Sequence, residues 1–164
     1  MCGIAGEITF DGSLSATLVE KMLDNLAHRG PDAKGIYSQD NICLGHRRLK
    51  IIDLSDHASQ PMVDPELGLT LVFNGCIYNY RALRQELEQL GYHFFSNSDT
   101  EVILKAYAQW QEKCLDKFNG MFSFTIFERD TGQLFVARDR LGIKPFYYFE
   151  HTKGIAFAST LPAL

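Results

Sequence analysis

The chain opens with Met1-Cys2-Gly3-Ile4-Ala5-Gly6-Glu7-Ile8-Thr9-Phe10, a strand-like stretch with a cysteine directly behind the initiator methionine. Removal of Met1 would place the Cys2 thiol and the free α-amine on one residue. An α-amine has a pKa of about 8, against about 10.4 for lysine, so near neutral pH it can accept the thiol proton. This is the terminal-amine form of an activated nucleophile. Cys2 is equally consistent with an ordinary N-terminus, and the glycines with a close backbone approach or a bulge.

The composition indicates one globular domain. The chain has 164 residues, of which 46% are hydrophobic and 22% charged. A net charge of −4 argues against a nucleic-acid partner. No apolar run is long enough to cross a membrane and no signal peptide is present, so we expect a cytoplasmic protein without a membrane partner. The four cysteines are widely spaced, which favours free thiols and no metal site.

Hydrophobic periodicity predicts three helices set among strands. The first begins at Ser15 and ends at Gly30-Pro31, and the second covers 80–90, with Asn79 as its N-cap and Leu83, Leu87 and Leu90 inward. The third begins at the capping box 98–101 and runs to Trp110. Strands are expected at 3–10, 42–47, 69–73, 122–126, 134–137, 147–149 and 155–158. Without strict strand–helix alternation, we expect helices outside two stacked sheets rather than a doubly wound parallel sheet.

Two segments carry polar groups at the ends of apolar stretches. His46-Arg47-Arg48-Leu49-Lys50-Ile51-Ile52-Asp53 contains three cations that could form a carboxylate-binding fork, although locally a solvated strand face is favoured. In Phe73-Asn74-Gly75-Cys76-Ile77-Tyr78-Asn79 the Asn-Gly pair is typical of a hairpin turn, the interpretation that local sequence favours. It could instead present two N–H donors side by side, as an oxyanion hole requires. Asp99 complements a helix dipole and also suits an ammonium ligand.

Seven segments together, in this order, resemble the class II glutamine amidotransferase domain, a member of the N-terminal nucleophile hydrolases. The resemblance runs essentially from end to end. Within the class the chain is most similar to asparagine synthetases, and 69–80 resembles the N-acetylglutaminylglutamine amide synthases in particular. The segments are Met1-Cys2-Gly3-Ile4, His28-Arg29-Gly30-Pro31-Asp32, Gly45-His46-Arg47-Arg48-Leu49-Lys50-Ile51-Ile52-Asp53, Gln60-Pro61-Met62, Phe73-Asn74-Gly75, Ser98-Asp99-Thr100-Glu101 and Arg138-Asp139-Arg140-Leu141-Gly142-Ile143-Lys144-Pro145.

The resemblance implies an α+β fold for residues 1–164, a four-layer αββα sandwich of two mainly antiparallel sheets. It implies that Met1 is removed and that the Cys2 thiolate attacks the side-chain amide of L-glutamine. Asn74 and Gly75 would stabilise the oxyanion, ammonia would leave, and water would hydrolyse the thioester to glutamate. Cys2, Asn74 and Gly75 are therefore the expected catalytic residues. His28 and His46 are expected to be structural, because the terminal amine supplies the base.

The resemblance also implies how the substrate is held. Arg48 would bind the α-carboxylate and Asp99 the α-ammonium, while the backbone of Leu49-Lys50-Ile51-Ile52 lines the pocket. This pair suits an amino acid better than the nonpolar amide of an acylase. Cys76 stands where the family often has an acidic residue or glycine, so the ammonium would rest on the Cys76 carbonyl and more heavily on Asp99. Oxidation could link Cys76 to Cys2.

In the family, this domain supplies ammonia to a synthetase domain or subunit that uses ATP and magnesium to activate a carboxylate. No Ser-Gly-Gly-rich phosphate loop occurs here, so we expect no cofactor in this domain. The chain is expected to be a C-terminally truncated piece that lacks the synthetase, with a strand edge open to association, a homodimer included. The competing interpretation is a non-catalytic or regulatory module that retains the fold.

Overall fold

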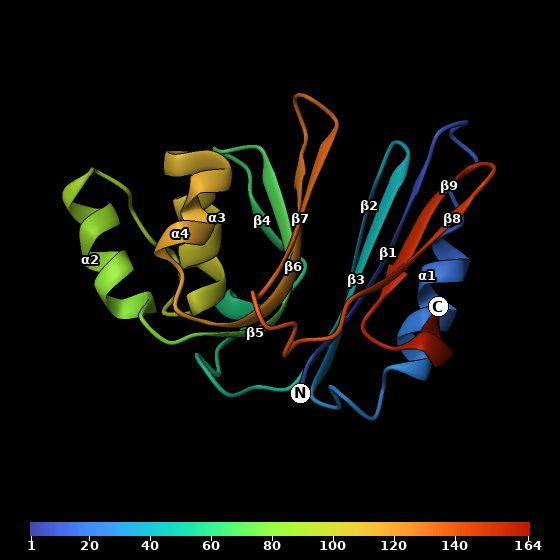
Figure 1. Ribbon diagram of the computed structural model, residues 1–164, viewed down its shortest axis with the longest axis horizontal. Coiled ribbons are helices and arrows are strands. Elements are labelled where there is room, and N and C mark those ends of the chain that lie inside the picture. Colours follow the sequence, from blue (N-terminus) through green and yellow to red (C-terminus); the bar gives the residue numbers. More distant parts are fainter.

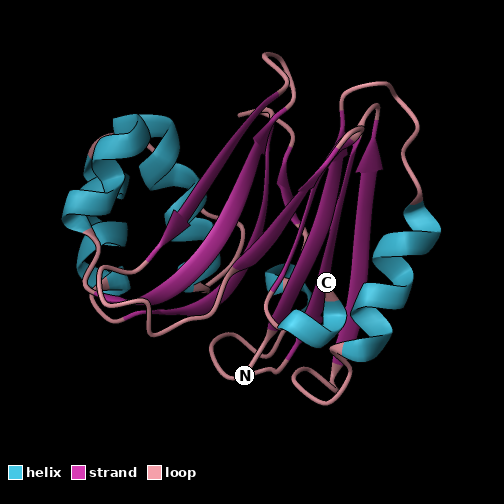
Figure 2. Cartoon of the chain, turned by 45° about the vertical axis from the view of Figure 1, so that its right-hand side comes forward, coloured by secondary structure: helices cyan, strands magenta, loops and turns pink.

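Nine strands form two antiparallel sheets in the computed structural model, which describes residues 1–164. The sheets lie face to face, and the helices cover only their outer faces (Figure 1). Figure 2, in which helices and strands are coloured differently, shows the same order of helix, sheet, sheet and helix from one side to the other. This arrangement confirms the predicted α+β sandwich of four layers. No helix is long and apolar enough to cross a membrane.

The first sheet places the N-terminus in its centre. Its strand order is β2-β3-β1-β9-β8, and α1 (Ala16–Asn25) packs on its outer face through Val19, Met22 and Leu23. Because β1 pairs with β3 in the register Gly3 to Arg47, Cys2 lies beside the end of β3. The strands are β1 (Gly3–Thr9), β2 (Ala33–Gln39), β3 (Ile42–Arg48), β8 (Tyr147–His151) and β9 (Gly154–Ala158).

The second sheet has the order β4-β5-β6-β7 and leaves part of β5 unpaired on one side. The short β4 (Met62–Asp64) pairs only with 69–71, whereas β6 (Gly120–Glu128) pairs with all of β5 (Leu69–Ile77). Beyond Leu71, β5 therefore has one free edge. The remaining elements are β7 (Gln133–Arg138), α2 (Tyr80–Gln89), α3 (Asp99–Trp110), α4 (Cys114–Lys117) and three 3₁₀ turns at Asp56–Ala58, Gln111–Lys113 and Leu161–Ala163.

Apolar side chains fill all three spaces between the four layers. The largest cluster joins the second sheet to its helices, and a smaller one lies under α1. Between the sheets, large side chains lose almost all contact with water, each stabilising the fold by about 1.5–3 kcal/mol. These are Ile4, Ile42, Leu44, Val72, Phe127 and Phe157.

The helices begin near their predicted positions, and the predicted cap of α3 is present: Ser98 Oγ accepts from the N–H groups of Thr100 and Glu101. Two other details differ. The predicted inward position of Leu90 is wrong: it follows the end of α2 and is exposed. Asn79 makes no cap hydrogen bond; its amide instead donates to Lys117 O and accepts from Asn119 N.

Three further differences concern boundaries and strands. α1 ends at Asn25, not at Gly30, and turns continue to Arg29. The strand β2 was not expected, because its residues alternate between half-buried and exposed positions and carry little apolar signal. The hairpin interpretation of Asn74-Gly75 is wrong, since both residues lie inside the continuous strand β5.

Candidate active site

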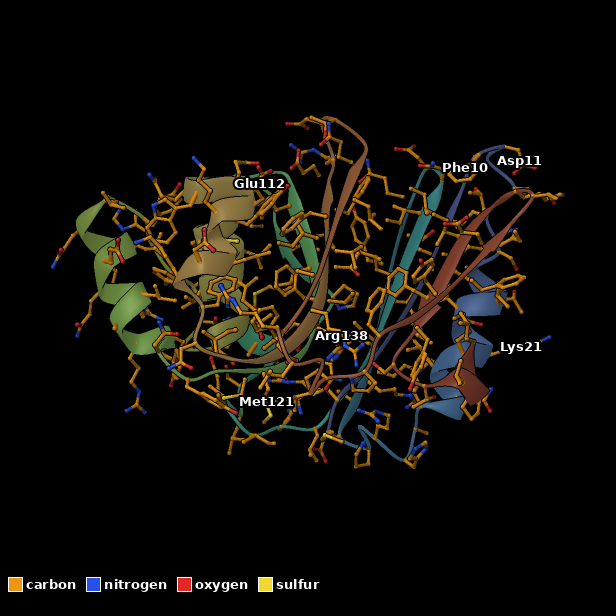
Figure 3. The ribbon with its side chains drawn as sticks, viewed as in Figure 1. Phe10, Asp11, Lys21, Glu112, Met121 and Arg138 are labelled. Carbon is orange, nitrogen blue, oxygen red and sulfur yellow. The ribbon has the colours of Figure 1, made fainter.

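A cavity of about 280 Å³ opens at the end of the sandwich where the chain begins. In Figure 3, Met121, one of its lining residues, lies at this end, and Phe10 and Asp11 lie at the other. The volume suits a small molecule such as an amino acid. The cavity brings together every predicted site residue except Lys50. It is lined by Met1, Cys2, Arg48, Leu49, Ile51, Ile52, Ala58, Gln60, Phe73, Asn74, Gly75, Cys76, Tyr78, Asp99, Thr100, Met121 and Lys144.

The Cys2 sulfur is held against the backbone that follows β3. Leu49 N lies 3.4 Å from Sγ and donates to it, and Sγ lies 3.7 Å from Leu49 O. Burial raises the pKa of the Cys2 thiol, while the Leu49 N–H, the terminal amine and Arg48 act in the lowering direction. The net pKa is raised, so the resting thiol is protonated and its reaction as a nucleophile requires a base.

The backbone around Cys2 is fixed from two other elements. Arg29 Nε donates a 3.0 Å hydrogen bond to Cys2 O, and Ile4 N donates to Ser159 Oγ at 2.9 Å. Arg29 belongs to a motif that sequence reasoning noticed but gave no chemical role. The position of Cys2 is therefore set by β1, by Arg29 and by Leu49, while its side chain faces the cavity.

Asn74 carries a donor without a partner. The side chain is 1% exposed, and its Nδ2 has no hydrogen-bond partner. A buried amide N–H that makes no hydrogen bond costs free energy, so it is uncommon unless a ligand uses it. Because Asn74 lines the cavity that also contains Cys2, this donor is available to a molecule bound there.

Gly75 supplies a second donor through the register of the sheet. Phe122, which lies opposite Gly75, directs its N–H and its carbonyl at Asp139. In an antiparallel pair of strands, two opposite residues direct their N–H and C=O groups either both toward each other or both away from each other. Phe122 directs its groups away from β5, so the Gly75 N–H points away from β6, to the free edge of β5. Its neighbours on that edge are occupied: Phe73 N donates to Gln60 Oε1 and Ile77 N to Asp99 Oδ2.

Asp99 presents a carboxylate to the same cavity. It is 4% exposed, and burial raises its pKa to about 6 although the N–H groups of Ile77, Asp99 and Thr100 act in the other direction. One oxygen accepts from Ile77 N at 3.0 Å. A buried carboxylate with so high a pKa is an energetically costly anion, and an ammonium ligand would offset that cost.

Arg48 is buried and organises the loop that follows it. Its Nη1 donates to Ser55 O at 2.9 Å and its Nη2 to Asp53 O. Asp53 in turn accepts from Asn97 N, which ties this loop to the start of α3. The remaining guanidinium N–H groups leave Arg48 able to bind a carboxylate in the cavity that it lines.

Lys50, whose backbone was expected to line the pocket, does not line the cavity. It forms an ion pair with the exposed Asp56 at 3.3 Å, and its backbone N–H donates to Asp32. The contribution expected from Lys50 is therefore not seen, whereas Leu49, Ile51 and Ile52 do line the cavity. Sequence periodicity could not separate these neighbours, because the stretch is an irregular loop in which side-chain direction follows no fixed period.

Two cavity residues belong to family motifs to which the sequence assigned no role. Gln60 accepts from Phe73 N and donates to Thr100 Oγ1, so it connects the free edge of β5 to α3. Lys144 enters from the loop after β7. Cys76, an expected substrate-binding residue, follows Gly75 on β5 and also lines the cavity. Burial raises the pKa of the Cys76 thiol, Asp99 raises it further, and Lys144 acts in the opposite direction.

His46 lies outside the cavity lining and has a structural contact. Its Nε2 lies 3.1 Å from Phe73 O, and burial lowers the pKa of the ring to about 3. The ring is neutral at physiological pH and connects the two sheets, as expected of a structural histidine. No group of three metal-ligating side chains occurs in the chain.

Comparison with known proteins places the whole chain in one group. A family model described as glutamine amidotransferase domain matches residues 1–164. Asparagine synthetase [glutamine-hydrolyzing] 3 of Bacillus subtilis is 39% identical over 168 residues, covering 100% of this chain and 27% of that protein. Asparagine synthetase B of Escherichia coli is 39% identical over 170 residues, with 100% and 30% coverage. The chain thus spans less than a third of these relatives.

A solved structure has the same fold. The glutamine phosphoribosylpyrophosphate amidotransferase of B. subtilis, in complex with ADP and GMP, superposes with a TM-score of 0.84. It is 22% identical, and the match covers 99% of this chain and 42% of that one. At this identity the likeness concerns the fold alone.

Proposed function

Because the chain belongs to the glutamine amidotransferase domain family, as a class II domain of the asparagine-synthetase type with the N-terminal nucleophile hydrolase fold, we propose that it hydrolyses L-glutamine through a thioester on Cys2. The ammonia released would serve an ATP-dependent amidation by a synthetase domain or subunit.

The observation that carries the proposal is the pair of unused donors beside the thiol. Asn74 Nδ2 is buried without a partner, and the Gly75 N–H points to the free edge of β5. Both residues line the cavity that contains Cys2. Tetrahedral attack on an amide converts its carbonyl into an oxyanion, and two preorganised N–H donors in a buried site stabilise that charge.

The charges in the cavity fit the rest of the substrate. Glutamine carries an α-carboxylate and an α-ammonium at the end remote from its amide. Arg48 and Asp99 offer one cation and one anion, both buried and both lining the cavity. Binding at that end holds the amide in place for attack, which lowers the entropic cost of the reaction.

The proton of the thiol requires an acceptor, because the pKa of Cys2 is raised. In the mature chain the α-amine of Cys2 would accept this proton and later deliver it to the departing ammonia. With Met1 attached, the amine belongs to the wrong residue and Met1 itself lines the cavity. The unprocessed chain is therefore expected to be inactive.

The synthetase partner is proposed from the relatives. Two of them are named as glutamine-hydrolysing asparagine synthetases, and this chain spans 27% and 30% of their lengths. We propose that ATP and magnesium act only in that partner, and no step in this domain uses either. The carboxylate that accepts the nitrogen would be recognised there.

A glutamine-analogue electrophile, 6-diazo-5-oxo-norleucine, tests the proposal directly. The chain is treated with methionine aminopeptidase, its intact mass is checked for loss of Met1, and labelling is assigned by peptide mass. We expect one label on Cys2, protection by L-glutamine, and glutamate release that is lost in Cys2→Ala. A folded, processed chain that neither labels nor releases glutamate would contradict catalysis and favour the regulatory module.

A further inference from the structure

Lys144 is a buried cation without an anionic partner. The residue is 4% exposed and forms no ion pair; its Nζ contacts Met1 Sδ at 3.2 Å. A thioether is a weak acceptor, and buried ammonium groups are normally paired. The other buried lysine, Lys105, illustrates this rule through its ion pair with Asp64 at 2.5 Å.

Backbone hydrogen bonds to Asp139 hold Lys144 against the cavity. Asp139 Oδ2 accepts from Lys144 N at 2.9 Å, and Asp139 Oδ1 accepts from Ile143 N at 2.8 Å. Since Asp139 uses its oxygens on backbone groups, it does not pair with the Lys144 ammonium. The position of this ammonium is thus set by the loop and not by a counter-ion.

The groups that face Lys144 are two cysteines and few charges. Burial lowers the pKa of Lys144, Arg29 lowers it further, and Cys2, Cys76 and Asp139 act in the opposite direction. Cys2 also faces the terminal amine, Arg48 and Asp99. Lys144 lines the same cavity as Cys2, and removal of Met1 takes away the group that its Nζ contacts.

The charges of the substrate leave Lys144 unmatched. The α-carboxylate of glutamine is matched by Arg48 and its α-ammonium by Asp99, as proposed above. The side-chain amide is neutral. The oxyanion is matched by the Asn74 and Gly75 donors, as also proposed above. The anion left without a partner is the Cys2 thiolate, which has to form inside a cavity where burial disfavours it.

We propose that Lys144 is a positioning residue for the reacting sulfur: once Met1 is removed, its ammonium lies against Cys2 and stabilises the thiolate. The role of Lys144 in catalysis rests on the proposed function of the chain. The ionisation of Cys2 can nevertheless be measured without glutamine, so the two proposals can fail separately.

The test measures the rate of alkylation of Cys2 by iodoacetamide from pH 5 to pH 10, on chain freed of Met1. Peptide masses separate Cys2 from Cys76. An opposite charge within about 4–6 Å lowers an acid pKa by about 1–3 units. We therefore expect Lys144→Met to raise the apparent pKa of Cys2 by about one unit or more, and Lys144→Arg to restore most of the wild-type value.

Lys153→Met is the matched control, because Lys153 is exposed and faces Asp11 at the far end of the sandwich. It should leave the Cys2 pKa unchanged. An unchanged pKa in folded Lys144→Met would overturn the proposal. A pKa raised equally by Lys144→Met and Lys144→Arg would also overturn it, since that result indicates a purely structural role.

A reciprocal measurement covers the case in which Lys144→Met does not fold. Competitive acetylation with acetic anhydride gives the pKa of the Lys144 amine in the processed wild-type chain and in Cys2→Ala. Coupled ionisations shift each other equally, so removal of the thiol should lower the Lys144 pKa by the same amount. Identical Lys144 pKa values in the two chains would contradict the proposal. If Lys144→Met raises the Cys2 pKa but the wild-type chain is not labelled by 6-diazo-5-oxo-norleucine, only the proposed function is refuted.

Discussion

Phe122 and Asp139 exchange two hydrogen bonds at the end of the second sheet. Asp139 N donates to Phe122 O at 2.8 Å, and Phe122 N donates to Asp139 Oδ2 at 3.2 Å. Asp139 thereby occupies both polar backbone groups of Phe122, and its other hydrogen bonds hold the loop that carries Lys144. One carboxylate therefore fixes both the strand opposite Gly75 and the loop that carries the cavity residue Lys144.

Asp139→Asn should destabilise the fold. Burial alone would raise the pKa of Asp139, but the backbone N–H groups of Lys144, Ile143 and Phe122 bring it below its ordinary value. The ionised carboxylate therefore stabilises the fold above about pH 4, and this contribution disappears as the pH falls through the lower folded pKa. We expect a loss of about 2–3 kcal/mol in the free energy of unfolding at pH 7, measured in urea.

The loss should shrink in acid, where the wild-type carboxyl also becomes protonated. Asp130→Asn, at an exposed position, is the control and should change little. A loss for Asp139→Asn that is independent of pH would show that the charge is unimportant.

Asn74→Ala should reduce turnover while leaving substrate affinity nearly intact. The Nδ2 donor has no partner in the free protein, so its hydrogen bond would form with the oxyanion. Loss of one such donor lowers kcat by about 100-fold to 1,000-fold. Steady-state glutamate release gives kcat and KM separately. Asn41→Ala removes an amide that donates to Thr9 O, away from the cavity, and should leave kcat unchanged. A rise in KM alone for Asn74→Ala would assign that amide to substrate binding.

Gly75→Ala should damage both the sheet and the reaction. A Cβ at this position would lie 2.3 Å from Met121 O and 2.7 Å from Phe122 Cα, so the strands must move apart. We expect a loss of about 1–3 kcal/mol in stability and a fall in kcat. Comparison with Gly12→Ala, at a turn where no atom lies within 4 Å but φ is 72°, separates backbone strain from the close approach. Alanine retains the backbone N–H, so a normal kcat in Gly75→Ala would contradict the expected displacement of this donor.

Glutamine binding should strengthen as the pH rises through about 6. The free Asp99 carboxyl has a pKa of about 6, and only its ionised form pairs with the α-ammonium. Below that pH, KM should rise about tenfold for each unit. Asp99→Asn retains an acceptor for Ile77 N, but its KM should be high and independent of pH in this range. A wild-type KM that is flat from pH 5 to pH 8 would contradict the role of Asp99.

The same carboxyl gives the opposite trend for stability. Its folded pKa lies above the ordinary value of 3.8, so the folded state binds more protons than the unfolded state between about pH 4 and pH 6. Ionisation of Asp99 therefore costs stability as the pH rises through this range. Asp99→Asn should be more stable than the wild type at pH 7.5 and should lose this advantage near pH 4.

The helices could be predicted because their apolar faces repeat along the chain. Val19, Met22 and Leu23 of α1 are all buried at the predicted spacing. The Asn-Gly pair could not be understood locally, since an apolar strand followed by these residues resembles a hairpin in isolation. What keeps β5 straight is contact from distant segments: β6 pairs with its whole length, and on the other edge Gln60 binds Phe73 N and Asp99 binds Ile77 N.

The site residues were identifiable because they occur in motifs, whereas their geometry was not. The sequence placed Lys50 beside Arg48 without indicating that one faces solvent and the other the cavity. Lys144 lies 142 residues from Cys2 in the sequence, and no periodicity connects them. Lys144 reaches the cavity that also contains Cys2 because Asp139 holds the loop after β7.

The brevity of β4 has a consequence for protein engineering. If residues 58–61 joined the ladder, a backbone acceptor would occupy the Gly75 N–H and the sheet would gain hydrogen bonds. Such a variant would melt at a higher temperature and turn over more slowly. A thermostability screen run without an activity assay would therefore enrich variants in which the Gly75 N–H is bound by a neighbouring strand and is lost to the reaction.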